Sequence, residues 1–310
     1  MPPNPLSARQ IGTFSKNLID ASFLVERPHI VVWCQRRGPV TQSMTTTSMP
    51  DGTTVFCIQP AEAKVLDSHI EGYMTNGITV EPGDTVFDVG ANIGLFGVRM
   101  AQRCNGDLRI IALEPIPAIR QCTERNLSAW NDATVLPYGV ATEVGEATFT
   151  YYPHAPSLSS AHTEDWNDQD DAMKNAIVGN ARTAPMWYAK LFPSFLAGLM
   201  ARWMVASPET YVCELRPLSH IIAELDVRRI DLLKIDCEGA EEQALLGIAD
   251  DHWPMVKQAV IEVHDLDGRL DRVVALLKAN GLSEITVEKE PALQRTLLSN
   301  VYAHRPRGRS

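Results

Sequence analysis

The chain has 310 residues, of which 45% are hydrophobic, enough for one large α/β domain or for one domain with an insertion. Its formal net charge is −10, which argues against a nucleic-acid-binding face because such faces are normally basic. The six cysteines form no C-x-x-C pair, so they indicate neither a zinc site nor a disulfide framework, and no metal is expected.

Neither a secretory signal nor a membrane span is indicated. The first ten residues, MPPNPLSARQ, lack the apolar core of a signal peptide. Residues 185–206 are rich in Met, Trp, Phe and Leu, but Lys190, Pro193 and Arg202 interrupt them, and no run of 18 apolar residues survives. We therefore expect a cytoplasmic protein with reduced thiols and no membrane contact.

The first 75 residues show no regular alternation of elements. Residues 1 to about 27 are typical of a loose arm with a short helix. The elements predicted after it are a strand at 29–34, a Thr/Ser-rich loop at 41–48, a Pro-Asp-Gly turn at 50–52, a strand at 53–58 and a helix at 61–73. We expect residues 1–75 to form an amino-terminal arm and small strands that cap a cofactor site.

From residue 76 onward, strands and helices alternate. Strands are predicted at 86–89, 108–113, 134–141, 147–152, 231–236, 258–264, 285–288 and 300–303, and helices from 95 and at 117–130, 218–225, 241–248 and 270–280. This alternation favours a doubly wound, mostly parallel α/β sheet, with the last two strands antiparallel to each other. The main domain should span 76–304, with 154–210 as a helical, aromatic-rich insertion and 305–310 as a flexible tail.

A strand, a glycine turn and a helix start follow one another at Asp84–Val98. The amino-terminus of a helix offers N–H groups and partial positive charge, so it can receive an anion. A dinucleotide site requires three glycines, but only Gly90 and Gly94 are present, and Asp88 before them would repel a pyrophosphate and attract an ammonium. S-adenosylmethionine carries both an ammonium and a carboxylate at its methionyl end. The turn therefore favours this cofactor over an ordinary strand–turn–helix.

Ligands of doubly wound sheets bind at the carboxyl ends of the strands, where the strand order reverses. The residues at such ends are Asp88, Glu114, Gly139, Asp236 and His264. Glu114 is placed to accept hydrogen bonds from a ribose, and Ile116 could lie against an adenine, although a solvated carboxylate before a proline is the alternative for Glu114. Asp236 is either a helix N-cap or a carboxylate near the sulfonium. Glu238 and Glu241 are better explained by the helix amino-terminus than by catalysis.

Glu262 and His264 share one face of a buried strand. Buried polar groups need partners, and histidine is the commonest general base near neutral pH. We expect Glu262 to hold the imidazole and His264 to take a proton from the acceptor; a core histidine bonded to the backbone is the alternative.

The insertion carries many large apolar side chains. Phe195, Leu199 and Trp203 recur at four-residue steps and form one stripe of a helix, with Trp187 preceding them. Such a stripe could be a lid over a bulky, partly apolar acceptor. Core packing or the face of a homodimer would give the same pattern.

Several stretches together resemble the FkbM-type S-adenosylmethionine-dependent methyltransferases of microbial natural-product pathways. They are Tyr73–Ile78, Phe87–Phe96, Glu114–Pro117, Phe149–Pro153, Ile230–Glu241, Val260–Leu270 and Asn300–Ala303. The resemblance implies a seven-stranded, Rossmann-like methyltransferase sheet that releases S-adenosylhomocysteine. Two departures are Gly239, where related sequences often carry lysine, and the aromatic insertion.

The expected site has three groups of residues. Cofactor binding is assigned to Tyr73, Asp88, Gly90, Ala91, Asn92, Gly94, Glu114, Pro115, Ile116, Gly139, Val140 and Asp236. Catalysis is assigned to His264, Glu262 and Asp236, and acceptor binding to Tyr152, Trp187, Phe195, Leu199, Trp203 and His264.

The expected reaction is methyl transfer to a small-molecule secondary metabolite, most simply at oxygen. N- or C-methylation of an aromatic or indole-type alkaloid is the alternative. A nicotinamide-dependent oxidoreductase is disfavoured by Asp88 and the missing third glycine. A non-catalytic module that binds the cofactor is a further alternative of a different class.

Overall fold

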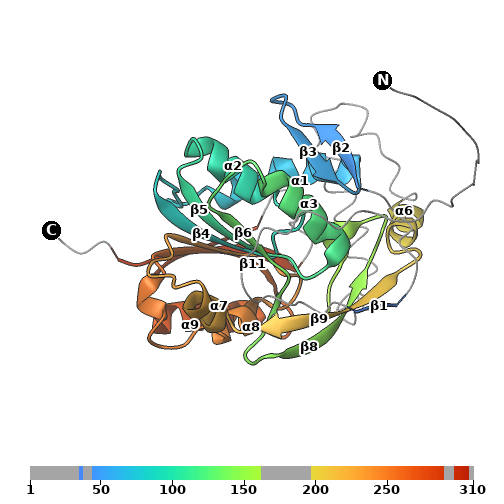
Figure 1. The fold of residues 1–310 in the computed structure, drawn as a ribbon. Helices are drawn as coiled ribbons and strands as arrows, with labels where there is room; N and C mark the ends of the chain where they lie inside the picture. Colours follow the sequence, from blue (N-terminus) through green and yellow to red (C-terminus); the bar gives the residue numbers. More distant parts are fainter. Residues whose placement is uncertain (1–34, 38–43, 162–196, 290–296, 307–310) are drawn as a thin grey trace, which may run out of the picture. The chain divides into compact units, whose positions relative to one another are not determined.

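The structure is a computed structural model that describes residues 35–37, 44–161, 197–289 and 297–306 (Figure 1). All of these residues lie in the compact unit formed by 33–310. The predicted strand at 29–34 and the residues Trp187 and Phe195 lie outside the described residues.

A seven-stranded sheet forms the centre of the unit, in the order β12-β13-β11-β10-β4-β5-β6. The strands are β4 (Asp84–Val89), β5 (Leu108–Leu113), β6 (Ala133–Leu136), β10 (Leu232–Ile235), β11 (Gln258–His264), β12 (Glu284–Glu288) and β13 (Leu298–His304). Neighbours from β11 to β6 pair in parallel, whereas β13 is antiparallel to both β11 and β12. The predicted doubly wound, mostly parallel sheet is confirmed. Its order reverses between β4 and β10, which places a ligand site at their carboxyl ends.

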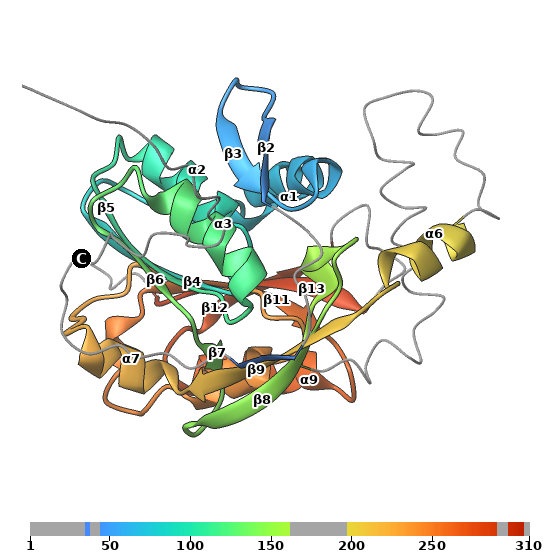
Figure 2. The same ribbon diagram turned by 45° about the vertical axis from the view of Figure 1, so that its right-hand side comes forward.

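Helices cover both faces of this sheet (Figures 1 and 2). One face carries α1 (Pro60–Tyr73), α2 (Leu95–Arg103) and α3 (Pro117–Leu127), and the other carries α7 (Leu218–Glu224), α8 (Glu241–Leu246) and α9 (Arg269–Ala279). Both α1 and α3 begin at a proline. The N–H groups of a helix's first turn have no partner within the helix, so proline, which has no N–H, loses no hydrogen bond there.

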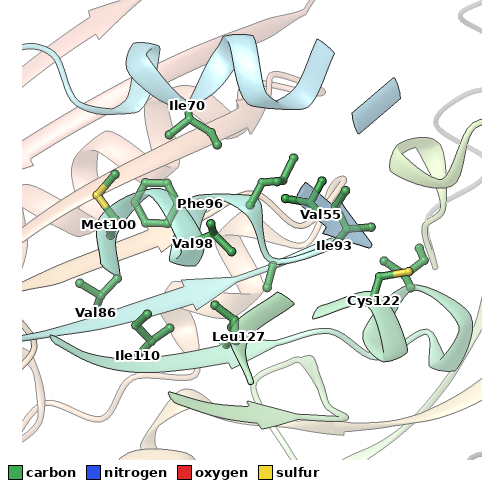
Figure 3. Close-up of a cluster of buried hydrophobic side chains, with 14 of the residues drawn as sticks. Val55, Ile70, Val86, Ile93, Phe96, Val98, Met100, Ile110, Cys122 and Leu127 are labelled. Carbon is green, nitrogen blue, oxygen red and sulfur yellow. The ribbon is translucent and has the colours of Figure 1, made fainter. Parts of the chain in front are cut away.

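The apolar core beneath α1, α2 and α3 fixes these helices on the sheet (Figure 3). Ile70 of α1 and Phe96 of α2 belong to the same buried cluster as Val86 of β4 and Ile110 of β5. Because side chains of this size contribute about 1.5–3 kcal/mol each when fully buried, this packing stabilises the helices against β4 and β5.

The strand predicted at 134–141 is broken. Pro137 follows β6 and cannot donate to a ladder, and the chain leaves the central sheet there. After it, β7 (Gly139–Val140) joins a second sheet with β1 (Gln35–Arg37), β8 (Gly145–Tyr151) and β9 (Glu209–Arg216). The predicted loop at 41–48 is also corrected, because β2 (Thr45–Ser48) pairs with β3 (Thr54–Cys57).

The insertion ends in a strand that the sequence analysis missed. We expected no strand between 154 and 210, but β9 begins at Glu209 and pairs antiparallel with β8 along its length. The insertion also contributes a 3₁₀ helix at Pro156–Leu158 and the helix α6 (Ala197–Met204). None of the helices in the described ranges is long and apolar enough to cross a bilayer.

The tail predicted to begin at 305 is anchored at its first residue. The guanidinium of Arg305 donates to the backbone oxygens of Val256, at 2.7 Å, and Asn280, at 3.1 Å.

Candidate active site

A cavity of about 810 Å³ opens at the carboxyl ends of β4, β5, β10 and β11. Helix α1, residues 154–161 and helix α6 contribute its other walls. This volume lies within the range of pockets that enclose a cofactor or a drug-sized ligand. The cavity therefore occupies the place that the strand order predicts for a ligand.

The glycine turn lies against the end of β10. Gly90 has φ +72°, and a Cβ there would sit 1.7 Å from the backbone oxygen of Asp236. Only glycine allows this approach. The N–H groups of Gly90 and Ala91 both donate to the oxygen of Leu113, at 3.1 and 2.9 Å. We expected open N–H groups for an anion; the structure corrects this, because the turn uses them to bind β5.

Asp88 has a different partner from the one expected. Its side chain is fully buried beneath the turn and does not line the cavity. The Nζ atom of Lys234 lies 3.0 Å from Asp88 Oδ1 and donates to the oxygen of Gly90 at 2.8 Å. Burial lowers the pKa of Lys234, but the charges of Asp88 and Asp236 outweigh it and keep the amine protonated. The ammonium that Asp88 meets is therefore that of Lys234, not that of a ligand.

Glu114 connects the turn to the cavity. Its Oε2 accepts from the N–H of Asn92 at 3.1 Å, and its Oε1 accepts from the N–H of Ile116 at 2.9 Å. Burial raises the pKa of this carboxyl to about 7 although both hydrogen bonds oppose the change. A carboxylate held in this way presents its remaining lone pairs to the cavity.

Tyr73 brings two carboxylates together from distant strands. Its hydroxyl lies 3.0 Å from Asp236 Oδ2 and 3.2 Å from Glu262 Oε2. One phenol has one proton to donate, so two carboxylates compete for it. Both carboxylates line the cavity, where a ligand ammonium can donate to them. Glu262, predicted to hold the imidazole of His264, lies against Tyr73 of α1, and the two ring nitrogens of His264 lie against Glu238 and Glu241.

His264 lies between two carboxylates that come from the loop before α8 and from α8 itself. Its Nδ1 is 3.3 Å from Glu241 Oε1 and its Nε2 is 3.2 Å from Glu238 Oε2. Burial lowers the pKa of His264, but the hydrogen bonds and charges of Glu238 and Glu241 raise it well above the ordinary 6.5. The imidazole is therefore protonated at neutral pH.

Glu241 and Glu238 differ in their surroundings. Glu241 is fully buried, accepts from the N–H of Gly239 at 2.7 Å, and lies 3.6 Å from the guanidinium of Arg269. Glu238 lines the cavity, and burial raises the pKa of its carboxyl. Of the two acids, Glu238 is the one that a ligand can reach.

The structure gathers most of the predicted residues around one cavity. Those lining it are Tyr73, Gly90, Ala91, Asn92, Glu114, Pro115, Ile116, Gly139, Val140, Trp203, Asp236, Glu262 and His264. Asp88, Gly94, Tyr152 and Leu199 do not line it. Gly94 instead packs against α3, since a Cβ there would lie 2.9 Å from Thr123 Cγ2. Leu199 is 69% exposed, so the predicted stripe does not face the cavity as a whole.

The apolar wall of the cavity comes partly from α6. Met200, Trp203 and Met204 line it, and the Trp203 indole stacks on the His154 ring with centroids 4.6 Å apart. These side chains provide an adaptable apolar surface beside the polar groups of β10 and β11.

Lys234 and Glu62 of the site were missed in the sequence, and Glu238, which lines the cavity, was assigned to the helix amino-terminus instead. Lys234 stands in an otherwise apolar strand between Asp231 and Asp236, and a buried lysine there was a signal that it pairs with an acid. Glu62 gave no local signal, because its partner Ser157 is 95 residues away.

The family relationship is shown by comparison with known proteins. The sequence model described as the methyltransferase FkbM domain matches residues 88–283. The "31-O-demethyl-FK506 methyltransferase FkbM" of Streptomyces tacrolimicus is 33% identical over 270 residues, covering 85% of this chain and 98% of that protein. The "AMB antimetabolite synthetase AmbE" of Pseudomonas aeruginosa is 33% identical over 275 residues, which are 86% of this chain and 13% of the synthetase.

A solved structure of methyltransferase FkbM from Methylobacillus flagellatus matches 78% of this chain and 51% of that one, with 14% identity and a TM-score of 0.43. The sequence relationships, together with the doubly wound sheet, identify this chain as a methyltransferase of the FkbM family.

Proposed function

We propose that this methyltransferase transfers a methyl group from S-adenosylmethionine to an oxygen atom of a small, largely apolar secondary metabolite. The observation that carries the proposal is one cavity that is lined both by the predicted cofactor residues at the ends of β4 and β5 and by the ionisable pair His264 and Glu238. The name of the Streptomyces relative refers to an O-demethylated FK506 and favours oxygen as the acceptor atom.

The cofactor fits the residues of this cavity. The lone pairs of Glu114 can accept from the ribose hydroxyls, and the apolar Ile116 and Val140 can lie against the adenine. Asp236 and Glu262, which share one Tyr73 proton, can receive the ammonium of the methionyl end. When bound, the cofactor supplies an electrophilic methyl group on a sulfonium.

The acids at the cofactor site act mainly through binding. A carboxylate close to the sulfonium would stabilise its charge in the ground state more than in the transition state, where that charge is smaller. The hydrogen bond from the Tyr73 hydroxyl fixes the side chain of Asp236, whose Oδ2 lies 3.8 Å from Lys234 Nζ. We assign it to the ammonium rather than to the reacting centre.

Proton removal is assigned to Glu238 together with His264. A hydroxyl acceptor loses its proton as the new O–CH₃ bond forms. The protonated His264 cannot take that proton, so the carboxylate of Glu238 accepts it. The imidazolium lies 3.2 Å from Glu238, and its Nδ1 donates to Glu241, which fixes the ring from the other side. His264 then orients Glu238 and stabilises its negative charge, and it is not itself the base.

The test uses ¹³C-methyl S-adenosylmethionine and a pool of hydroxylated natural products. The carbon chemical shift of the product methyl group separates O-, N- and C-methylation, and an O-methyl product supports the proposal. Glu238→Gln should lower kcat by about 10²–10⁴-fold without changing the affinity for S-adenosylhomocysteine. Absence of cofactor binding, or a methyl group on carbon or nitrogen, would contradict it.

A further inference from the structure

Glu62 is a carboxylate of the cavity that the proposed reaction does not use. It lies in the first turn of α1 and lines the cavity on the side of residues 154–161. It also lies outside residues 88–283, the part of the chain that matches the FkbM family model.

Ser157 holds this carboxylate by one oxygen. The N–H and the hydroxyl of Ser157 both donate to Glu62 Oε1, at 2.9 and 2.6 Å. Within the described residues no hydrogen bond is made to Oε2. A carboxylate oriented through one oxygen presents the other to whatever fills the cavity.

The electrostatic surroundings of Glu62 are acidic. Glu238 lines the same cavity and its charge acts on Glu62, and Cys57 and Tyr151 lie close enough to be affected by the charge of Glu62. Burial raises the pKa of Glu62 to about 7, although the bonds from Ser157 oppose this, and the charge of Glu238 adds to the increase.

Few cations balance these acids. Among the described residues that line the cavity, Lys234 is the one lysine or arginine, and it is paired with Asp88. The histidines on the lining are His69, His154 and His264, the last already between two carboxylates. The acceptor side therefore attracts hydrogen-bond donors and cations and repels anions.

We propose that Glu62 is the residue that selects the acceptor. Its Oε2 binds a hydrogen-bond donor, an ammonium or a hydroxyl, on the apolar acceptor molecule. Acceptors that carry a carboxylate or a phosphate at this position are rejected. This inference rests on the proposed function and names the class of its substrate. A purely structural Glu62 would only cap the 3₁₀ helix through Ser157, and Glu62→Gln keeps an oxygen that can do so.

The experiment uses three probes that share one indole body and differ in the head group. They are tryptamine, with an ammonium; tryptophol, with a hydroxyl; and indole-3-acetate, with a carboxylate. Binding is measured by calorimetry to the full chain saturated with S-adenosylhomocysteine. We expect tryptamine and tryptophol to bind and indole-3-acetate not to bind. Glu62→Gln should weaken the binding of tryptamine by about ten-fold or more, because it removes a hydrogen bond between charged groups.

The matched control is Glu71→Gln. Glu71 lies on the same helix but is exposed, pairs with Arg103 at 2.5 Å and does not line the cavity. This variant should bind the probes as the wild type does. The affinity of the wild type for tryptamine should also rise about ten-fold between about pH 6 and pH 8 as Glu62 ionises through a pKa of about 7, since an alkylammonium stays charged until about pH 10. In Glu62→Gln this rise should be smaller, because Glu114 and Glu238 are then the remaining acids of the cavity whose pKa values are raised.

Three results would overturn the inference: indole-3-acetate binding as tightly as tryptamine, equal tryptamine affinities in Glu62→Gln and Glu71→Gln, or no tryptamine binding to the wild type. Binding of S-adenosylhomocysteine is measured in the same samples. If it is intact, these results reject the role of Glu62 alone; if it is absent, the proposed function itself fails.

Discussion

His264→Ala should destabilise the protein through charge rather than through lost packing. The substitution removes an imidazolium that lies 3.3 Å from Glu241 and 3.2 Å from Glu238. Glu241 is fully buried and would keep backbone N–H donors such as that of Gly239 and the guanidinium of Arg269 at 3.6 Å, but no imidazolium. Breaking a buried ion pair by removing one partner costs about 3–5 kcal/mol, so we expect a loss of this size in the free energy of unfolding.

A double-mutant cycle measured by urea denaturation separates charge from packing. Glu241→Gln removes the orphaned charge, so His264→Ala should cost about 1.5–3 kcal/mol less in that background. Glu242→Gln is the matched control, because Glu242 is the next residue of α8 and binds Arg272 at 2.8 Å instead. His264→Ala and Glu242→Gln should be additive within about 0.5 kcal/mol.

The pH dependence gives an independent check of the charge. The folded-state pKa of His264 lies well above the ordinary 6.5, so its stabilising contribution is complete below about pH 6.5 and is lost as the pH rises through the folded-state value. The deficit of His264→Ala should therefore shrink in the alkaline range. A deficit that is the same in the Glu241→Gln background and at every pH would refute the assignment of a charged imidazole.

Substitutions at Glu114, Gly90 and Lys234 test the cofactor side of the cavity. Glu114→Ala should weaken the binding of S-adenosylhomocysteine, measured by calorimetry, by about 1.5–3 kcal/mol for each lost hydrogen bond to the carboxylate. An unchanged dissociation constant would rule out the ribose role. Burial raises the pKa of Glu114 from its ordinary value of 4.5 to about 7, so the wild type loses stability as the pH rises through this range. In Glu114→Gln the loss of unfolding free energy between about pH 5 and pH 8 should therefore be smaller by about 2–3 kcal/mol. Equal losses in the two proteins would contradict this. Gly90→Ala should abolish cofactor binding and lower the melting temperature, because its Cβ would lie 1.7 Å from a backbone oxygen, whereas Gly145→Ala, with nothing within 4 Å, should be close to neutral. Lys234→Met leaves Asp88 buried without its ammonium and should cost about 3–5 kcal/mol in unfolding free energy, and adding Asp88→Asn should recover part of it; no recovery would mean that the pair is not ionic.

The sequence by itself determined the central sheet and the edge at which a ligand binds. Short apolar runs mark β4, β5, β10 and β11, and each run ends at a turn residue, so the periodicity and the turn chemistry agree. The alternation with helices then requires a parallel sheet and brings Glu114, Asp236 and His264 to one edge. The strand β9 was missed because it follows a long insertion and its pairing with β8 joins residues far apart in the chain.

Only the tertiary structure decided which polar groups pair. Asp88 looked available to a ligand because its sequence neighbours say nothing of Lys234, which comes from a strand 146 positions later. Glu262 looked like the partner of His264 because they alternate on one strand, but Tyr73 reaches Glu262 from α1, and Glu238 and Glu241 reach His264 from the loop before α8 and from α8 itself. Hydrophobic periodicity is a local property that one strand or helix carries alone, whereas the partner and the protonation state of a buried charge depend on whichever side chains the fold brings within about 4 Å.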